Sequence, residues 1–314
     1  MELPDANTMN AVVFDGPYKV SLQQRPVPKI RDDDDIVVKV LAAGLCGSEL
    51  HMFRGHEPAP AGVIMGHEFT GTVVAAGENV ETVKIGDRVV APFTVSCLLF
   101  GSERLDGGQA QFVRVPFADG TVVKAPAEID DEALILMADI FPTGFFGARN
   151  AFNGLGMQDP TEATAVVVGC GPVGLCALIS ALEYKPKHIF AIDSVDSRLE
   201  IARSLGAEPL NFKTDPEGMI KRIKQVTEGR GADVVIEVVG LKPALRTAYE
   251  VMPFTATDGY ECPVRSVFPD ALKVLAKKQH VFSFMFEHIM PLSEAVSGYD
   301  MFDKMQVQKV IFKP

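Results

Sequence analysis

The pattern of hydrophobic and polar positions divides the chain into two kinds of sequence. Before about residue 123, short apolar stretches alternate with polar positions, and Gly, Pro and Asp separate them. Short alternations between turn residues are typical of β-strands, so this part is predicted to be mostly β. Glu132–Phe152 has a helical pattern that is interrupted near Pro142. The predicted strands are 11–14, 20–22, 36–42, 72–75, 88–91 and 111–115.

From residue 163 the pattern alternates between strand-like and helix-like stretches, which predicts a doubly wound parallel sheet. The tail then mixes helices with a last strand. We therefore expect two domains, one β-rich (1–144 and 263–314) and one α/β (145–262). The predicted strands of the α/β part and tail are 164–168, 188–192, 233–239 and 309–312, and the helices are 173–183, 196–205, 216–228, 243–252, 269–278 and 292–304.

A glycine-rich turn follows the first strand of the α/β part. In its G-x-G-x-x-G spacing, the glycines allow a tight turn, approach of backbone N–H groups to a pyrophosphate, and close packing of helix and strand. The helix start adds N–H donors and a positive dipole end. The next strand ends at Asp193, whose carboxylate can accept hydrogen bonds from an adenosine ribose and would repel a 2′-phosphate. We predict NAD binding over the alternative, an ordinary strand–helix turn with a surface carboxylate. The predicted turn residues are Gly169, Gly171, Pro172, Val173 and Gly174.

Composition limits the classes of partner. The 314 residues carry a net charge of −11 without a cluster of Lys and Arg, which argues against nucleic acid and anionic membranes. An uncharged span at 165–182 approaches membrane-spanning length. Its glycines and proline fall where the nucleotide turn needs them, so we do not expect a membrane helix here. The run Arg31–Asp35 is interpreted as a solvated loop and not as a cation site, because adjacent carboxylates do not converge on one point.

The first residues and the cysteines indicate the compartment. The first residues lack the charged and apolar regions of a signal peptide, and the five cysteines form no C-x-x-C pair. We therefore expect a cytoplasmic protein with reduced thiols, at least one of which is available to a metal ion.

Two short segments hold groups that suit a metal. One contains Cys46, Ser48 and His51, and the other contains His67 followed by Glu68. A Cys and a His on separate loops with carboxylates nearby suit a catalytic zinc, which accepts all three ligand types and keeps one position open. Taken singly, Cys46 is better explained as a buried small apolar residue and His67 as a hydrogen-bonded turn residue.

Several motifs resemble the zinc-containing medium-chain alcohol dehydrogenase family in order and spacing. The likeness covers nearly the whole chain and is strongest to formaldehyde and other alcohol dehydrogenases with a Cys, His and Asp zinc site. It implies a GroES-like catalytic domain joined to a Rossmann domain. The matching stretches are Cys46-Gly-Ser-x-x-His51, Gly66-His-Glu-x-x-Gly71-x5-Gly77, Gly86-Asp-Arg-Val89 and Gly108-Gln-Ala-Gln-Phe112.

The resemblance implies the ligands of the zinc. These would be Cys46, His67 and Asp139, the last lying in Asp139-Ile-Phe-Pro-Thr-Gly144. The alternative for Asp139 is a helix-terminal carboxylate without a ligand role. Glu68 would lie beside the metal, as an occasional ligand or an electrostatic partner.

The resemblance also implies a proton path and further cofactor contacts. Ser48 would take the proton of the alcohol and pass it through the nicotinamide ribose to His51 near solvent. The alternatives are a turn hydroxyl and a surface histidine. Arg198 is a candidate partner of the adenosine ribose, or else an exposed helix charge, and Thr143 is a candidate nicotinamide contact.

Two departures from the family bear on function. Relatives often carry four closely spaced cysteines for a structural zinc, whereas Cys97 has no other cysteine before Cys170, so we expect one catalytic zinc and no structural zinc. In the family, two further strands follow the helix that corresponds to 243–252. Here only nine residues, 253–261, lie between this helix and Cys262, which is too few for two strands and their connection. In relatives those strands line the nicotinamide site and pair across the dimer. Their loss would weaken that site, expose a sheet edge and leave a homo-oligomer without its usual pairing strand.

The expected function is a zinc-dependent oxidoreductase that transfers a hydride between a small alcohol, or a hydrated aldehyde, and NAD. Intact Cys46, Ser48, His51, His67 and Asp139 favour this enzyme. The missing strands favour the alternative, a catalytically impaired, shortened isoform that binds nucleotide or zinc in a structural or regulatory role. A zinc-free quinone reductase of the same superfamily fits less well, because it has no use for a paired Cys and His.

Overall fold

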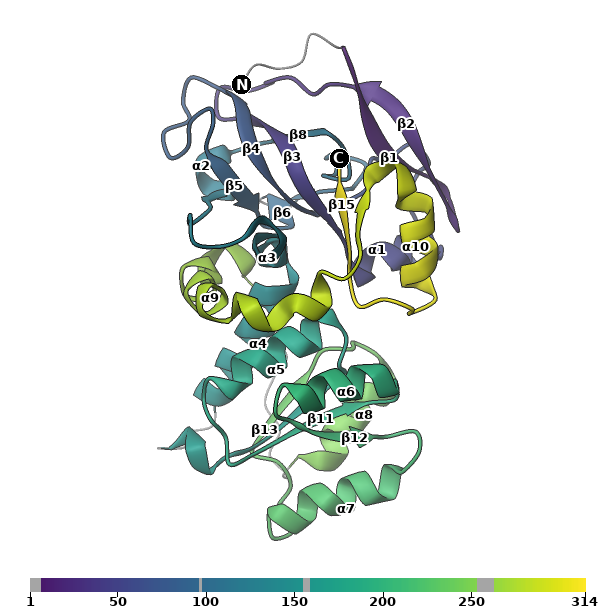
Figure 1. Ribbon diagram of the computed structural model, residues 1–314, viewed down its shortest axis with the longest axis vertical. Coiled ribbons are helices and arrows are strands. Elements are labelled where there is room, and N and C mark those ends of the chain that lie inside the picture. The colour runs from purple at the N-terminus through teal and green to yellow at the C-terminus, as the bar shows by residue number, and fades with distance from the viewer. Residues whose placement is uncertain (1–6, 96–97, 155–158, 253–262) are drawn as a thin grey trace. The chain divides into compact units, whose positions relative to one another are not determined.

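The chain leaves its first folded unit, forms a second one and then returns to the first. The computed structural model describes residues 7–95, 98–154, 159–252 and 263–314 (Figure 1). One unit comprises Met1–Asp139 with Leu275–Pro314, and the other comprises Ile140–Val274. The domain boundaries expected from the sequence, after residues 144 and 262, stay a prediction, and Cys97 and Cys262 lie outside the described residues.

A sheet of seven strands, counted among the described residues, forms the centre of the first unit. Its order is β14, β15, β3, β4, β5 and β9, and β8 also pairs with β3. The β3–β4 pairing is antiparallel and runs from Ile36 opposite Ala76 to Gly44 opposite Glu68. Both strands are mostly buried, which explains their apolar sequences. The bounds are β3 (Ile36–Leu45), β4 (Glu68–Ala76), β5 (Arg88–Ala91), β8 (Phe112–Val115), β9 (Val123–Lys124), β14 (Ile289–Pro291) and β15 (Val310–Lys313).

Two hairpins and several short helices complete the first unit. The longer hairpin pairs β1 with β2, and the shorter one pairs β6 with β7. Phe100, just after β7, packs edge-on against Phe69 of β4 with ring centres 4.9 Å apart, so the short hairpin is joined to the core. The bounds are β1 (Thr8–Gly16), β2 (Lys19–Pro26), β6 (Thr94–Val95), β7 (Leu98–Leu99), α1 (Gly47–Phe53), α2 (Ala118–Thr121), α3 (Asp131–Leu134), α10 (Ala295–Asp303), and the 3₁₀ helices η1 (Ile135–Ala138), η3 (Gln279–Met285) and η4 (Leu292–Glu294).

The second unit contains a parallel sheet with the order β12, β11, β10, β13. The predicted alternation of strands and helices is confirmed, and the short strand β12 is an addition to it. Among the described residues β13 is an outer strand, as expected for a shortened sheet. The bounds are α4 (Ile140–Asn153), η2 (Pro160–Glu162), β10 (Thr164–Val168), α5 (Pro172–Leu182), β11 (His188–Asp193), α6 (Asp196–Ser204), β12 (Glu208–Asn211), α7 (Pro216–Val226), β13 (Val234–Glu237), α8 (Lys242–Val251) and α9 (Val264–Lys278), which continues into the first unit.

The glycine-rich turn connects β10 to α5. Gly169 has a φ of +96°, a backbone conformation that favours glycine. A Cβ atom on Gly174 would collide with the carbonyl oxygen of Gly169, so only glycine allows the helix to approach the strand this closely. These two positions have the conformational roles that the G-x-G-x-x-G spacing predicts.

Two predicted helix limits were wrong. The interruption expected near Pro142 lies at Asp139, whose backbone angles of φ −150° and ψ −69° separate η1 from α4, and the helix then continues through Pro142. A proline near a helix start replaces an N–H that has no partner within the helix, so Pro142 does not end it. Helix α9 begins at Val264, before the predicted start at Pro269. No helix among the described residues is long and apolar enough to span a membrane.

Candidate metal centre

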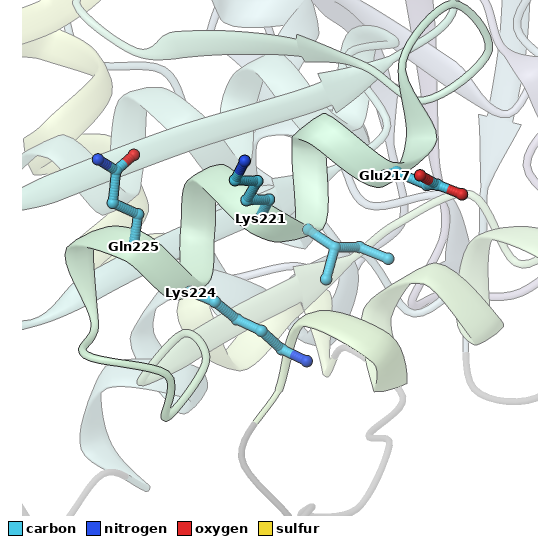
Figure 2. A pocket seen from close by; sticks show the side chains of 5 residues that line it. Glu217, Lys221, Lys224 and Gln225 are labelled. Carbon is cyan, nitrogen blue, oxygen red and sulfur yellow. The ribbon is translucent and has the colours of Figure 1, made fainter.

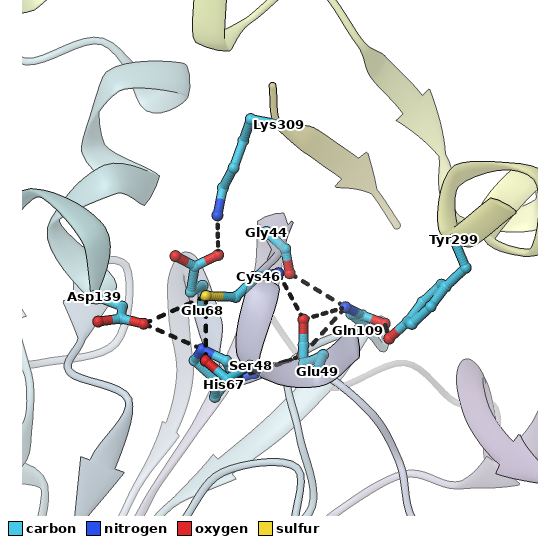
Figure 3. Close-up of polar contacts among 10 residues, drawn as sticks. All are labelled: Gly44, Cys46, Ser48, Glu49, His67, Glu68, Gln109, Asp139, Tyr299 and Lys309. Carbon is cyan, nitrogen blue, oxygen red and sulfur yellow. Dashed lines mark hydrogen bonds and ion pairs between the residues drawn. The ribbon is translucent and has the colours of Figure 1, made fainter. Parts of the chain in front are cut away.

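Three chain segments bring Cys46, His67 and Asp139 together in the first unit (Figure 3). Cys46 follows β3 and caps α1, and His67 directly precedes β4, so the antiparallel pairing of these strands places both residues at the same end of the sheet. Asp139 lies at the non-helical position between η1 and α4. The helix interruption, which the sequence analysis expected near Pro142, therefore positions the third candidate ligand.

The spacing of the three donor atoms fits a zinc ion. Asp139 Oδ2 lies 3.5 Å from Cys46 Sγ and 3.3 Å from His67 Nε2, and all three atoms are within 4.8 Å of one another. Tetrahedral zinc with ordinary bond lengths would separate a sulfur and an oxygen ligand by about 3.5 Å, and a nitrogen and an oxygen ligand by about 3.3 Å. A thiolate, an imidazole and a carboxylate also form a donor set that zinc accepts.

The protonation of these residues is strongly affected by their surroundings. Burial raises the pKa of the Cys46 thiol, and the negative charges of Glu68 and Asp139 raise it further. Burial lowers the pKa of His67, but the charges of Glu49 and Cys46 outweigh this effect and leave that pKa well above its usual value. Without a metal the centre therefore retains protons, which a divalent cation would displace on binding.

Glu49 holds the two loops of the centre together, and the sequence analysis did not single it out. Its fully buried carboxylate accepts hydrogen bonds from the backbone N–H groups of Cys46, at 2.8 Å, and His67, at 3.2 Å. Its Oε1 also lies 3.6 Å from His67 Nδ1. The signal that was available is the capping-box spacing, an acidic residue three positions after the residue that caps α1.

Glu68 forms a buried ion pair with Lys309, which precedes β15 (Figure 3). Both side chains are fully buried, and the Glu68 charge keeps the pKa of Lys309 raised although burial lowers it. The other carboxylate oxygen of Glu68 has no hydrogen-bond partner among the described residues. Lys309 was not predicted, because a single lysine near a final strand carries no sequence signal of its own.

Ser48 and His51 lie three residues apart on α1. Ser48 Oγ is 3.5 Å from Cys46 Sγ, so its hydroxyl adjoins the candidate metal centre. His51 is exposed, and its ring lies 5.9 Å from that of His56. A hydroxyl beside the centre and an imidazole in solvent are the two ends that the predicted proton path requires.

The predicted nucleotide-binding residues cluster around the glycine-rich turn of the second unit. The Asp193 carboxylate is buried and accepts backbone N–H bonds from Cys170, Ser194 and Val195 at 2.7, 2.7 and 2.9 Å. It therefore ties the turn to the end of β11, a structural role that the sequence analysis did not foresee. A Cβ atom on Gly171 would have only the Arg198 guanidinium within 4 Å, at 3.9 Å. The space beside the Gly171 backbone is therefore uncrowded and is bordered by the positive charge of Arg198.

Thr143 lies in the first turn of α4 and is half-buried. Val173 is half-buried in the first turn of α5, whose leading N–H groups have no partner within the helix. Their predicted contacts with a cofactor stay predictions.

A shallow surface hollow on α7 does not resemble a binding site (Figure 2). Its lining comes from one helix, and the labelled polar ends of Lys221, Lys224 and Gln225 do not converge on a common point. Ligand sites have convergent polar groups in a concave apolar surface. The candidate chemistry therefore lies at the metal centre and the glycine-rich turn.

Comparison with known proteins identifies the family of the chain. Residues 32–127 match the alcohol dehydrogenase GroES-like domain, and residues 172–257 match the zinc-binding dehydrogenase domain. The chain is 54% identical over 349 residues to the zinc-type alcohol dehydrogenase B of Aspergillus flavus, covering 98% of this chain and 82% of the relative. It is 59% identical over 287 residues to the medium chain reductase/dehydrogenase ucsI of an Acremonium species, covering 81% of this chain and 98% of the relative.

A solved structure agrees with these relatives. The alcohol dehydrogenase TADH from Thermus sp. ATN1 superimposes with a TM-score of 0.87 at 30% identity, covering 97% of this chain and 99% of that one. The chain belongs to the zinc-containing medium-chain alcohol dehydrogenase family and is an oxidoreductase of the GroES-like and Rossmann architecture. The expected family and fold class are confirmed.

The length of one alignment bears on the predicted deletion. The alignment with the Aspergillus flavus relative extends over 349 residues, whereas the whole chain has 314. The relative therefore has residues within the aligned region that this chain lacks, as the expected internal deletion requires.

Proposed function

We propose that the protein oxidises a small alcohol, or a hydrated aldehyde, with zinc and NAD as cofactors. The observation that carries this proposal is the convergence of Cys46, His67 and Asp139 at distances that suit tetrahedral zinc. In the overall reaction, the alcohol loses a hydride to NAD and a proton to solvent, which yields a carbonyl product and NADH.

The protein residues hold the metal ion and balance its charge. Cys46 and Asp139, both ionised when zinc binds, offset its two positive charges, and His67 is the neutral ligand. Bound zinc supplies a Lewis acid that lowers the pKa of an alcohol hydroxyl. Glu49 orients His67 through Nδ1, and Lys309 compensates the buried charge of Glu68.

The proton of the alcohol leaves through α1. Ser48 accepts it beside the metal centre, and His51 releases it to solvent after transfer along the nicotinamide ribose. An imidazole suits the solvent end because its ordinary pKa of about 6.5 allows it to accept and release protons near neutral pH.

The glycine-rich turn holds the adenosine and pyrophosphate parts of NAD. Its backbone is open at Gly171, where Arg198 offers a cation, and the helix start of α5 offers N–H donors to a pyrophosphate. Asp193 accepts hydrogen bonds from the adenosine ribose with lone pairs left over from its backbone contacts. NAD supplies the hydride acceptor.

A second candidate function is a catalytically impaired, shortened isoform that binds nucleotide or zinc without turnover. The outer position of β13 in the described sheet favours it, because the expected deletion removes strands that line the nicotinamide site in relatives. Both candidates predict a cytoplasmic protein that uses neither nucleic acid nor a membrane as a partner and that holds no structural zinc, and the enzyme in addition requires one catalytic zinc.

One experiment separates the two candidates. Purified protein is assayed for zinc content, for NAD binding by calorimetry, and for NADH production over a panel of primary and secondary alcohols and aldehydes. The enzyme predicts zinc, NAD binding and NADH formation with at least one substrate. Zinc and NAD bound with no turnover would support the impaired form. A protein that binds neither zinc nor NAD would contradict both candidate functions.

A further inference from the structure

A row of buried polar side chains connects the candidate metal centre to helix α10 (Figure 3). The Tyr299 hydroxyl donates a hydrogen bond to Gln109 Oε1 at 2.9 Å. The Gln109 amide nitrogen lies 3.4 Å from both carboxylate oxygens of Glu49 and 3.2 Å from the carbonyl oxygen of Gly44. Glu49 Oε1 in turn lies 3.6 Å from His67 Nδ1. Because Tyr299 and Gln109 are fully buried, water does not offer them alternative partners.

The donors and acceptors allow one direction along this row. An ionised carboxylate only accepts hydrogen bonds, so Gln109 must turn its NH₂ group toward Glu49 and its oxygen toward Tyr299. The Tyr299 hydroxyl is then the donor that satisfies this oxygen. Without that hydroxyl the buried amide oxygen would lose its donor, and the preference for this amide orientation would weaken.

The contact between Glu49 and His67 influences which ring nitrogen of His67 is available to a metal ion. For a His67 that binds a metal, Glu49 beside Nδ1 favours the tautomer with the proton on Nδ1, which leaves Nε2, 3.3 Å from Asp139 Oδ2, free to act as the ligand atom. A carboxylate in this position fixes the tautomer and ring orientation of a metal-binding histidine. The orientation of the Gln109 amide thus bears on how well His67 presents Nε2.

We infer that Tyr299 and Gln109 are positioning residues for the metal centre, acting on His67 through Glu49. This inference rests on the proposed binding of zinc by Cys46, His67 and Asp139. Tyr299 comes from α10, 190 positions after Gln109 in the sequence. The C-terminal helix therefore contributes to the metal centre although it supplies no ligand.

The competing explanation is that Tyr299 only fills the core. Its ring packs against Phe53 of α1 with centres 5.2 Å apart, and Tyr299→Phe would preserve this contact. The substitution removes the hydroxyl alone, so it separates packing from positioning. Gln109→Met removes the amide while keeping a side chain of similar length.

The test measures zinc affinity of the full chain by competition with a chelator, and the visible spectrum after replacement of zinc by cobalt(II). We expect Tyr299→Phe to weaken zinc binding about 3- to 10-fold and Gln109→Met about 10-fold, at the lower end of the effects of outer-sphere partners. Both variants should alter the cobalt(II) bands. In the Gln109→Met background, Tyr299→Phe should cost nothing further, because the link it acts through is gone.

The matched control is Thr121→Val, which removes a buried hydroxyl bonded to the Pro116 carbonyl in the same unit. It should leave zinc affinity and the cobalt(II) spectrum unchanged. An unchanged affinity in Tyr299→Phe, or an equal loss with and without Gln109, would overturn the inference while leaving the proposed function intact. Absence of zinc from the wild-type protein would instead refute the proposed function. If Tyr299→Phe does not fold, Gln109→Met alone decides, since unchanged affinity there would also overturn the inference.

Discussion

The candidate metal centre of the first unit and the helix that follows the outer strand of the second unit's sheet differ in how far their side chains are buried. Around the candidate metal centre, the side chains of Glu49, Gln109 and Lys309 are buried and have partners from distant parts of the sequence. In the second unit, the helix after the outer strand β13 exposes large apolar side chains, with Leu245 47% and Tyr249 59% exposed. The Aspergillus flavus relative has residues within the aligned region that this chain lacks, and the sequence analysis predicts that the loss falls on the second unit.

This comparison separates binding of the metal from positioning of the cofactor. The groups that would hold zinc depend on contacts among β3, β4, η1 and the C-terminal return, all of which belong to the first unit. The exposed apolar positions Leu245 and Tyr249 of α8 are four residues apart and so share one face of the helix, and Leu241, which caps the helix, is spaced in the same way. We expect substitutions around the metal centre to change the free energy of unfolding strongly, and substitutions on the exposed face of α8 to change it little.

The largest expected effect is loss of the buried lysine. Lys309→Met leaves the Glu68 carboxylate buried without its cation, which should lower the free energy of unfolding by about 3–5 kcal/mol. The double variant Lys309→Met with Glu68→Leu should recover most of the loss, because an apolar pair of similar volume can replace a buried ion pair. Denaturant unfolding of the three proteins provides the measurement.

Lys313 offers a matched control at the other end of the same strand. Its ion pair with Glu132 is 3.0 Å long, but 37% of each side chain is exposed. Lys313→Met should therefore change stability by about 0–1 kcal/mol. Equal losses in Lys309→Met and Lys313→Met would show that burial does not set the strength of these pairs.

A moderate effect is expected at the glycine-rich turn. Asp193→Gly should reduce the preference for NAD over NADP about tenfold, because the carboxylate that would repel a 2′-phosphate is removed. It should also weaken binding of both cofactors, since the turn loses its bond from Cys170 N–H to Asp193. Dissociation constants for both nucleotides give the answer, with Asp196→Asn on the adjoining helix as the control. An unchanged NAD to NADP ratio would remove Asp193 from the ribose site.

The smallest effect on stability is expected on the exposed face of α8. Leu245→Ser should change the free energy of unfolding by no more than about 0.5 kcal/mol, whereas Val251→Ala, buried on the same helix, should cost about 2 kcal/mol. If the face is open in solution, Leu245→Ser should also reduce self-association in sedimentation experiments. A large loss of stability in Leu245→Ser would mean that another part of the protein covers this face.

Local patterns predicted most of the secondary structure, whereas the set of three candidate ligands came from the resemblance to the alcohol dehydrogenase family. The G-x-G-x-x-G spacing fixes the turn between β10 and α5, because few other sequences permit the positive φ of Gly169 and the close approach at Gly174. β12 escaped prediction because Glu208-Pro-Leu-Asn211 is short and contains a proline, and its pairing with β11 is decided by tertiary contacts.

The polar supports of the metal centre could not be read from the sequence in the same way. Lys309 meets Glu68 across 241 positions and Tyr299 meets Gln109 across 190, and neither pair has a local spacing rule. Glu49 is the exception, since its distance of three residues from Cys46 follows the capping-box pattern. Short-range geometry is visible in sequence, whereas buried long-range partners appear only once the chain is folded.

The most direct test of the central claim is the zinc content of folded wild-type protein and of Cys46→Ala, measured by elemental analysis after purification in zinc-containing buffer. The proposed centre predicts one zinc per wild-type chain and none in the variant, with both proteins folded by circular dichroism. A wild-type protein without zinc, or a Cys46→Ala variant that keeps its zinc, would contradict the assignment of Cys46, His67 and Asp139 as the metal ligands.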